Sequence, residues 1–270
     1  MAKNLSKNRR PRVKPSRDVG EEALWIYGVN PVWECLKAHP KDVMEIYCSR
    51  DDPRAQVVLQ LAQAHNIPVS VMERRDLSNL LGHGHHQGLA ARLKTFRYEA
   101  LETLLTRLEA HKRPLLVLDG LQDPHNLGAI VRSACFLGAH AVILPKDRSV
   151  PVTGAVFKAS AGALAHLLVV QVTNLVRAME QLKSVGYWMV GLDVQGSLSI
   201  YDLEYTMPVG LVVGSEGTGL RPLVKKTCDF LVKIPGTGPV QSLNASVATA
   251  VALAEIRRQQ QLCFNASLRP

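Results

Sequence analysis

The feature that most limits the fold is a regular alternation of short apolar runs with longer segments of helical periodicity in the C-terminal part of the chain. Leu115–Leu118 and Val209–Val213 have the length and composition of buried strands. Segments 126–137 and 175–184 repeat apolar residues at helical spacing. Strands that alternate with helices indicate a mostly parallel sheet covered on both faces. We therefore expect an α/β domain over residues 113–270.

A smaller unit is predicted ahead of this domain, over residues 23–96. It reads as a βαβ-like module with strands near 43–49 and 89–96 and a helix near 53–66. Its length, about 70 residues, is small for independent folding. Residues 97–112 have helical composition and are expected to link the two domains.

The first 22 residues are predicted to form a basic, flexible arm. They lack apolar periodicity, and residues 1–20 carry +6 of the chain's formal net charge of +9. A basic arm on a nearly balanced body is typical of proteins that contact polyanions, although a solubilising tail without a partner has the same pattern.

Composition excludes several classes of protein. With 47% hydrophobic and 20% charged residues, the chain is not expected to be disordered or fibrous. It has no run of about 18 apolar residues and no apolar segment of a secretory signal behind its basic start. Its five cysteines are scattered without a Cys-X-X-Cys pair, which favours reduced thiols in a cytoplasmic protein without a structural zinc site.

The first of three polar loops follows the strand that ends at Leu118. Open parallel sheets bind ligands at the carboxyl ends of their strands, so such loops are candidate sites. Asn126 is placed to cap the next helix, whose free N–H groups attract anions. Arg132 lies in the second turn and could reach back towards a phosphate. A plain helix cap and a solvated arginine would give the same pattern.

The second loop spans Gly214–Arg221 and contains three glycines, which allow a ligand to approach the backbone closely. Their order is not that of the dinucleotide fingerprint, and the chain has no nucleotide-binding P-loop sequence. Both facts disfavour a nicotinamide dehydrogenase or an ATPase. Glu216 is expected either to accept a hydrogen bond from a hydroxyl or amine, or only to complement a helix dipole.

The third loop, 234–246, leads into the last predicted helix. Ser242, Asn244 and Ser246 gather donors and acceptors there, although these residue types also favour plain helix caps. Each loop alone is a weak signal. Because all three follow predicted strands, we expect them to surround one pocket.

In order, these loops resemble the three signature motifs of the SpoU family of RNA ribose 2′-O-methyltransferases, in the SPOUT superfamily. The motifs correspond to Asp123–Arg132, Val213–Gly219 and Ile234–Ser246, and the resemblance extends over about Leu115–Arg257. Two positions depart from the family pattern: Gly236 stands where methionine is frequent, and Ala245 where valine is usual.

The resemblance implies a fold, a cofactor and an assembly. The catalytic domain would be a SPOUT-type parallel sheet with a C-terminal trefoil knot, preceded by a small ribosomal-protein-like RNA-binding domain. S-adenosylmethionine would be held by Gly214, Ile234 and Leu243, largely through backbone groups. The enzyme would act as a homodimer in which one subunit completes the site of the other, and it would need no metal and no membrane.

The resemblance also implies a substrate and a reaction. The two-domain layout is most similar to bacterial members that methylate a guanosine of 23S ribosomal RNA. Members that act on transfer RNA share the motifs, and a non-catalytic RNA-binding or ribosome-assembly protein with this fold is the remaining alternative.

The candidate catalytic residues are assigned by motif match: Asn126, Arg132, Glu216, Ser242 and Asn244. Because a guanidinium has a pKa above about 12, we expect Arg132 to stabilise charge at the phosphate or 2′-oxygen rather than to act as a base. The motif match has Asn126 orient Arg132, Glu216 and Asn244 fix the ribose or Arg132, and Ser242 line the pocket.

Two further groups of side chains lie outside the motifs. The glycine-punctuated loop with His83, His85 and His86 could suggest a metal site, but no cysteine or carboxylate lies near it in the sequence. We expect this loop to contact RNA instead. The three tryptophans are expected in the core: Trp25, Trp33 and Trp188.

Overall fold

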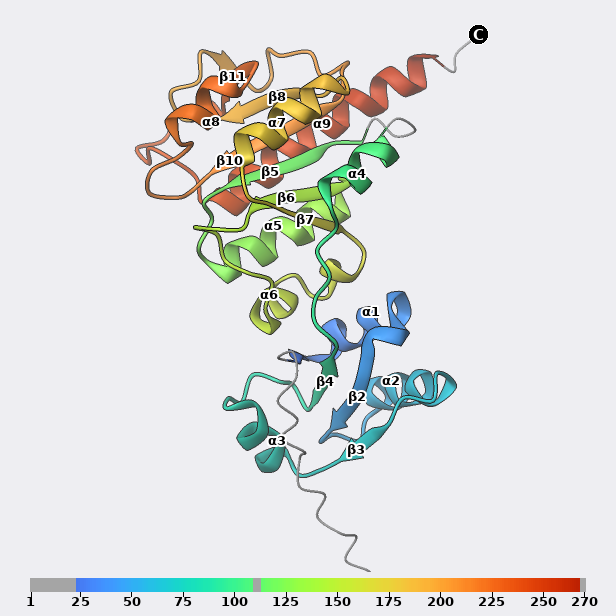
Figure 1. The fold of residues 1–270 in the computed structure, drawn as a ribbon. Coiled ribbons are helices and arrows are strands. Elements are labelled where there is room, and N and C mark those ends of the chain that lie inside the picture. The colour runs from blue at the N-terminus through green and yellow to red at the C-terminus, as the bar shows by residue number, and fades with distance from the viewer. Residues whose placement is uncertain (1–22, 109–112, 268–270) are drawn as a thin grey trace, which may run out of the picture.

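The computed structural model describes residues 23–108 and 113–267, with side chains up to residue 261. Figure 1 shows two bodies, a smaller one built from the first strands and helices and a larger one built from α4 onwards. The predicted basic arm, residues 1–22, lies outside the described residues, as do residues 109–112 of the predicted linker.

The smaller body is a four-stranded sheet with helices on both faces. The strand order is β1-β4-β2-β3, in which β2 and β3 are parallel and the other pairs antiparallel. Helices α1 and α2 pack on one face and α3 on the other, because apolar residues alternate sides along each strand. The elements are β1 (Leu24–Tyr27), α1 (Val29–Ala38), β2 (Val43–Cys48), α2 (Pro53–Ala64), β3 (Val69–Val71), α3 (Arg74–Leu81) and β4 (Leu89–Leu93), with a short 3-10 helix at Pro40–Asp42.

The starts of the first two helices show how local chemistry sets their bounds. Asp52 caps α2, accepting hydrogen bonds from the N–H groups of Arg54 (2.9 Å) and Ala55 (3.2 Å). Helix α1 is instead preceded by Gly28, whose φ of 103° is easily adopted only by glycine.

The larger body is a seven-stranded sheet in which every pairing is parallel, in the order β7-β6-β5-β10-β8-β11-β9. Its strands are β5 (Leu115–Asp119), β6 (Ala141–Pro145), β7 (Leu168–Val172), β8 (Trp188–Leu192), β9 (Leu198–Ser199), β10 (Val209–Gly214) and β11 (Phe230–Lys233). The central strands are apolar on both faces, as the sequence pattern predicts for a covered parallel sheet.

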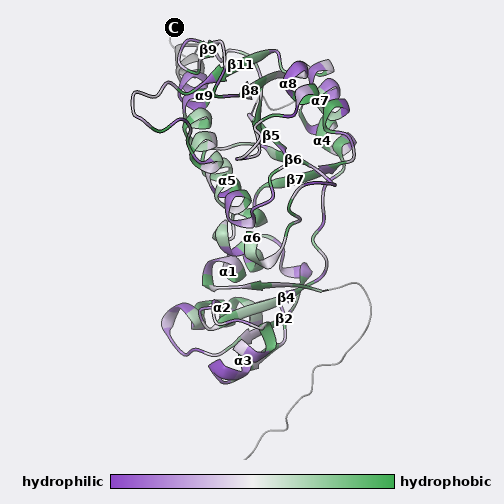
Figure 2. Cartoon of the chain, turned by 90° about the vertical axis from the view of Figure 1, so that its left-hand side faces the viewer, coloured by the Kyte–Doolittle hydropathy of each residue, from purple (hydrophilic) through white to green (hydrophobic). Residues whose placement is uncertain are grey.

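Helices cover both faces of this sheet (Figure 2). One face carries α4 (Leu101–Leu108), α7 (Leu175–Ser184) and α8 (Pro222–Thr227). The other carries α5 (Pro124–Phe136), α6 (Gly154–Ala159) and α9 (Ala245–Ser267), with a 3-10 turn at Ala163–Ala165. The predicted α/β class with a mostly parallel sheet is confirmed.

The two bodies are packed against each other through α6 and the turn that follows it. Carboxylate Oε2 of Glu34 lies 2.7 Å from Nε2 of His166, and Nε2 of His39 lies 2.9 Å from the carbonyl oxygen of Ala165. A side chain at Gly154 would collide with the carbonyl oxygen of Trp25. Their buried apolar residues form one cluster, so the junction is a packed interface.

The tryptophans depart in part from the core positions that the sequence suggests. Trp25 and Trp33 are partly buried and pack against apolar clusters. Trp188 is 42% exposed, and its ring stacks on Phe230 with the ring centroids 5.5 Å apart. Trp188 is wrongly predicted because it is the first residue of β8, at the rim of the sheet. Within the described residues, no helix has both the length and the apolar character needed to cross a bilayer.

Candidate active site

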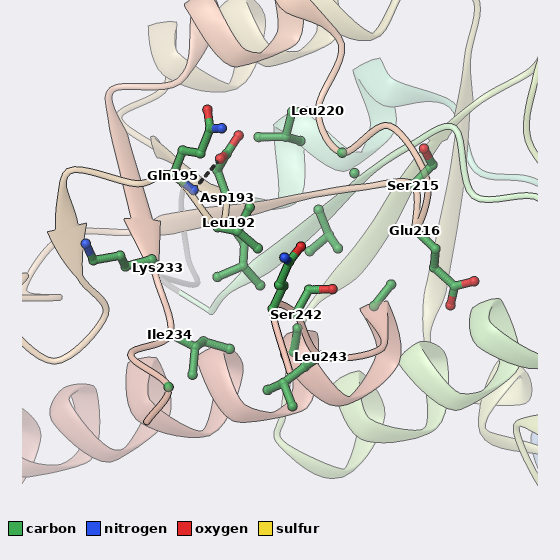
Figure 3. A pocket seen from close by; sticks show the side chains of 18 of the residues that line it. Leu192, Asp193, Gln195, Ser215, Glu216, Leu220, Lys233, Ile234, Ser242 and Leu243 are labelled. Carbon is green, nitrogen blue, oxygen red and sulfur yellow. Dashed lines mark hydrogen bonds between the residues drawn. The ribbon is translucent and has the colours of Figure 1, made fainter. Parts of the chain in front are cut away.

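A hollow of about 1060 Å³ opens where β8, β10 and β11 end. Its walls are the segments that follow these strands, residues 192–195, 213–220 and 233–245. This is the end at which open parallel sheets bind ligands, and the volume suits a small organic molecule. Figure 3 shows Glu216 on one side of the hollow and Asp193 and Gln195 on the other.

The wall formed by β10 depends on the absence of a side chain at Gly214. A Cβ atom there would lie 2.2 Å from the carbonyl carbon of Gly219 and 2.4 Å from the nitrogen of Leu220. The loop folds back on itself through two backbone hydrogen bonds between Ser215 and Gly219, of 3.2 and 3.0 Å. Only glycine at position 214 allows this closure, which presents backbone groups to the hollow.

Three of the predicted catalytic residues meet in one hydrogen-bonded network. The side-chain amide of Asn126 donates to Oε1 of Glu216. Nδ2 of Asn244 donates to the same oxygen at 2.7 Å and to Oδ1 of Asn126 at 3.0 Å. These residues are up to 118 positions apart in the chain. The network holds Glu216 through one carboxylate oxygen and leaves the other oriented to accept from a hydroxyl or an amine.

The network also shows which of the polar residues are plain helix caps and which belong to the site, a choice that the sequence left open. Asn126 is not the cap of α5; Asp123 is, through a 3.0 Å bond from the N–H of His125. Glu216 lies in the loop before α8 and does not sit in a first helical turn. Asn244 is both a member of the network and a cap of α9. Its Oδ1 accepts hydrogen bonds from the N–H (2.9 Å) and the hydroxyl (2.6 Å) of Ser246 at the start of that helix.

The residues assigned to the cofactor, together with Ser242, all line the hollow. Gly214 lines it from the second loop, and Ile234, Ser242 and Leu243 line it from the third. Figure 3 shows the last three facing the same space. Leu243 is 48% exposed and lines the hollow, so it presents apolar surface that a ligand there can cover. The two positions that depart from the family pattern, Gly236 and Ala245, line the same hollow.

Arg132 stands apart from this group within one chain. It lies on α5 six residues after Asn126, about 9 Å further along the helix axis, and its side chain is exposed. Among the described residues it makes no ion pair or hydrogen bond, and it does not line the hollow. Asn126 therefore does not orient Arg132 within the same chain, because its amide is used by Glu216 and Asn244.

An ion pair between a buried carboxylate and a partly exposed arginine, which sequence reasoning missed, joins the first two loops. Asp119, the last residue of β5, is fully buried, and its carboxylate accepts from the N–H (2.8 Å) and Nε (2.6 Å) of Arg221. Arg221 directly follows the glycine loop that contains Glu216. The ion pair therefore fixes the loop against the neighbouring strand. An aspartate ending an otherwise apolar strand was the available signal in the sequence.

Replacing Asp119 with asparagine is expected to raise the dissociation constant of S-adenosylmethionine by about tenfold or more, because a hydrogen bond to a charged group contributes about 1.5–3 kcal/mol. The amide can serve only one of the two Arg221 donors, so the glycine loop is held less firmly. Calorimetric titration with the cofactor would measure the change.

Asp229→Asn is a matched control for this variant. Asp229 also accepts from a backbone N–H (Met189, 2.8 Å) and from a cation (Lys183, 2.6 Å), but it precedes β11 at the other end of the sheet. Equal cofactor affinities for wild type and Asp119→Asn would contradict the assigned role. An equal loss of cofactor affinity in Asp119→Asn and Asp229→Asn would indicate a general loss of protein stability.

A second ion pair that the sequence did not predict, between Asp193 and Lys225, lies at the far side of the hollow. Burial opposes the charge of Asp193, but hydrogen bonds from Nζ of Lys225 (2.8 Å) and the N–H of Gln195 (2.8 Å) outweigh it and lower the pKa of this carboxyl. Asp193 is therefore ionised and fixed at neutral pH. Its spacing in the sequence carries no motif, so only the fold identifies it.

The histidine-rich loop differs from its prediction at one of its three positions. His86 is completely buried, and burial lowers its pKa. Its Nδ1 accepts from the N–H of Gly88 (3.0 Å), and its Nε2 lies 2.9 Å from the hydroxyl of Ser78. His86 is thus a neutral structural residue and cannot contact RNA. No group of three or more histidine, cysteine or acidic side chains suited to a metal occurs in the described part of the chain.

Two family models match the chain. The SpoU rRNA methylase family matches residues 113–254, which include the hollow and its three loops. A model for RNA 2′-O ribose methyltransferase substrate binding matches residues 25–99, which include the smaller sheet.

Individual relatives match with both parts of the chain. The 23S rRNA (guanosine-2′-O-)-methyltransferase RlmB of Pseudomonas putida is 44% identical over 242 residues, covering 88% of this chain and 97% of that protein. The SpoU methyltransferase AviRb of Streptomyces viridochromogenes, crystallised with AdoMet, superposes with a TM-score of 0.75 at 25% identity, covering 89% of this chain and 91% of its own.

A third match covers less of the chain. The TrmH/SpoU tRNA modifying enzyme of A. aeolicus superposes with a TM-score of 0.52 at 28% identity and covers 62% of this chain and 87% of its own. With a family model that matches more than half of the chain and a relative matched along nearly its full length, the chain belongs to the SpoU rRNA methylase family.

Proposed function

We propose that the protein transfers a methyl group from S-adenosylmethionine to a ribose 2′-hydroxyl of RNA, at a guanosine of 23S ribosomal RNA. The observation that carries this proposal is the meeting of Asn126, Glu216 and Asn244 beside a hollow at the carboxyl end of a parallel sheet. Membership of the SpoU family supports the reaction, and the name of the 44% identical relative supports the substrate.

The hollow fits S-adenosylmethionine by size and by chemistry. Its walls combine the apolar side chains of Ile234 and Leu243 with the backbone of two glycine-containing loops. Backbone groups can bind the polar parts of a nucleoside while apolar side chains cover its base. When bound, the cofactor supplies a methyl group on a sulfonium, which is already activated for transfer.

The side chains of this chain are assigned to positioning and to charge. Alignment of the hydroxyl oxygen with the methyl carbon and the sulfur can supply most of the rate enhancement. Glu216, held by two amides, accepts from the ribose or from Arg132, and Ser242 lines the pocket. Arg132 would stabilise the charge that develops on the hydroxyl oxygen, and the hydroxyl proton would pass to water or phosphate.

Because Arg132 does not reach the hollow of its own chain, we assign it to the hollow of a second copy in a homodimer. Exposed apolar side chains on α5 and α9 support a partner on this face. Phe136 is 88% exposed and Val247 48% exposed, and α5 and α9 pack against each other.

The finer architecture belongs to the same proposal. We assign residues 113–270 to a SPOUT methyltransferase domain whose C-terminal segment forms a trefoil knot, and residues 23–96 to binding of the RNA substrate. Residues 97–112 connect the two, and their helix α4 packs on the larger sheet. The basic arm 1–22 would add sequence-independent attraction to RNA phosphates, and the protein would act in the cytoplasm.

Ribosomal RNA is favoured over transfer RNA by the extent of the matches. The RlmB relative matches both bodies, whereas the tRNA modifying enzyme covers 62% of this chain. The intact network of Asn126, Glu216 and Asn244 argues against a non-catalytic assembly protein.

The test is incubation of the protein with labelled S-adenosylmethionine and 23S ribosomal RNA that lacks ribose methylation. We expect incorporation into RNA and recovery of 2′-O-methylguanosine after nuclease digestion. Incorporation into transfer RNA alone would move the assignment to the tRNA enzymes. RNA binding without incorporation into either would support the non-catalytic alternative.

A further inference from the structure

We infer that a surface at the junction of the two bodies binds an unpaired nucleobase of the RNA substrate together with an adjacent phosphate. The surface consists of the rings of Tyr27, His83 and His85 and the amine of Lys158, and we call it the junction platform. This inference rests on the proposed function only in taking RNA as the ligand. It concerns a site separate from the hollow at the sheet end.

The aromatic part of the junction platform is a continuous row of rings. The ring centroids of Tyr27 and His83 lie 4.3 Å apart, and those of His83 and His85 lie 5.9 Å apart. Tyr27 and His83 are half-buried and His85 is exposed, so the row is open to solvent on one side. The rings are tilted to one another, by 59° and 31°, so an unpaired base would stack on an exposed ring face and not between parallel rings.

The row is held in place by the buried His86 and by Arg50. Nη1 of Arg50 donates to the carbonyl oxygen of Gln87 at 2.9 Å, and the Arg50 side chain packs over Gly88. His86 attaches the same loop to α3 through Ser78, whose hydroxyl donates to the carbonyl oxygen of Arg74 at 3.0 Å. A pre-organised site binds with a smaller loss of conformational entropy than a mobile loop would.

The cation of the junction platform comes from the other body. Lys158 follows Gly154 by one turn of α6, and Gly154 lies directly against the ring of Tyr27. A Cβ atom on Gly28, the residue after Tyr27, would lie 2.6 Å from Nζ of Lys158. Among the described residues, Lys158 has no carboxylate partner, and desolvation lowers its pKa. A half-buried ammonium without a carboxylate is well suited to pair with an anion.

The combination of features favours single-stranded RNA over a metal or a free anion. Open aromatic surface is of no use to an inorganic anion, and the loop supplies no cysteine or carboxylate for a metal. Rings beside a cation match a base beside its phosphate. Because α6 belongs to the catalytic body, RNA bound there contacts both bodies at once (Figure 2).

The experiment uses the full-length protein and two labelled RNAs, a hairpin with an unpaired loop and a continuous duplex of the same length. We expect Tyr27→Leu and His83→Ala each to weaken binding of the hairpin roughly tenfold, with little effect on the duplex. Tyr27→Phe keeps the ring and should bind as wild type does. Lys158→Gln should lower the slope of log affinity against log salt concentration by about one.

Matched substitutions elsewhere provide the controls. Tyr201→Ala, His65→Ala and Lys226→Gln remove exposed residues of the same types, and they should change neither hairpin binding nor its specificity. Hairpin binding at wild-type strength in the Tyr27→Leu and His83→Ala variants would overturn the inference. Equal weakening of hairpin and duplex binding would also overturn it, because stacking requires unpaired bases.

The binding experiment tests the junction platform independently of the proposed enzymatic activity. Methyl transfer by the wild-type protein is measured in parallel at saturating RNA. If the wild type transfers no methyl group but the variants lose hairpin binding, the junction platform stands and the enzymatic proposal fails. If methyl transfer occurs and the variants bind normally, only the junction platform fails.

Discussion

Replacing Arg132 with alanine is expected to lower the rate constant of methyl transfer by about a thousandfold, a loss typical of removing one group that stabilises transition-state charge. Cofactor affinity should be unchanged, because the residues assigned to the cofactor, Gly214, Ile234 and Leu243, stay in place and Arg132 is assigned to the RNA. Single-turnover kinetics with labelled S-adenosylmethionine would measure the rate constant, and calorimetry the affinity. Parallel loss of both would show that the role assigned to Arg132 is wrong.

A control for this variant is Arg177→Ala, which removes an exposed arginine from α7 on the opposite face of the sheet. Its rate constant should equal that of wild type. Arg132→Lys should recover only part of the rate, because an ammonium cannot reproduce the planar fork of a guanidinium.

Subunit mixing extends the Arg132 experiment to the assembly. A mixed dimer of an Arg132→Ala chain and a chain with a closed hollow contains one complete site only if Arg132 serves its partner. We therefore expect activity from the mixture and none from either variant alone. An inactive mixture that has exchanged subunits would place Arg132 in its own chain's site, whereas activity of the Arg132→Ala variant alone would place it outside catalysis.

Changing Gly214 to alanine is expected to weaken S-adenosylmethionine binding by about two orders of magnitude. The added Cβ would lie 2.2 Å from the carbonyl carbon of Gly219. Overpacking costs about 1–3 kcal/mol, and the upper end applies here because backbone atoms cannot rotate away. Isothermal titration would measure the affinity. At cofactor concentrations far below its raised dissociation constant, this variant also supplies the closed hollow for subunit mixing.

Gly217→Ala is the control for Gly214→Ala, since it adds the same methyl group to the same loop. No atom lies within 4 Å of a Cβ placed on Gly217, and its φ is not in the left-handed region. We expect affinity close to that of wild type. If both variants lost affinity equally, flexibility of the loop, and not the close contact at Gly214, would explain the loss.

Local chemistry was sufficient to predict most helices and strands, but not every helix start. The strand ending at Leu118 and the helix near 175–184 follow from periodicity alone. The start of α5 could not be predicted in this way, because Asp123 and Asn126 are both good capping residues. Asp123 caps the helix, and Asn126 instead bonds to side chains from loops that lie far away in the sequence.

Burial was harder to predict than secondary structure. His86 lies in a loop of glycines and histidines that reads as exposed, yet it is completely buried. Trp188 reads as a core residue, yet 42% of it is exposed at the rim of the sheet. In both cases the neighbours that decide exposure come from other elements, and a sequence window does not contain them.

The sequence by itself determined the class of the larger sheet, the order of its three loops and the kinds of polar groups they carry, because these depend on periodicity and residue type over short distances. The tertiary structure alone decided that Glu216 receives two amides, that Asp119 anchors the glycine loop and that Arg132 stands away from its own hollow. Those facts depend on distances between residues 28 to 102 positions apart, or six apart on a helix with a fixed direction. Only the packed chain sets such distances.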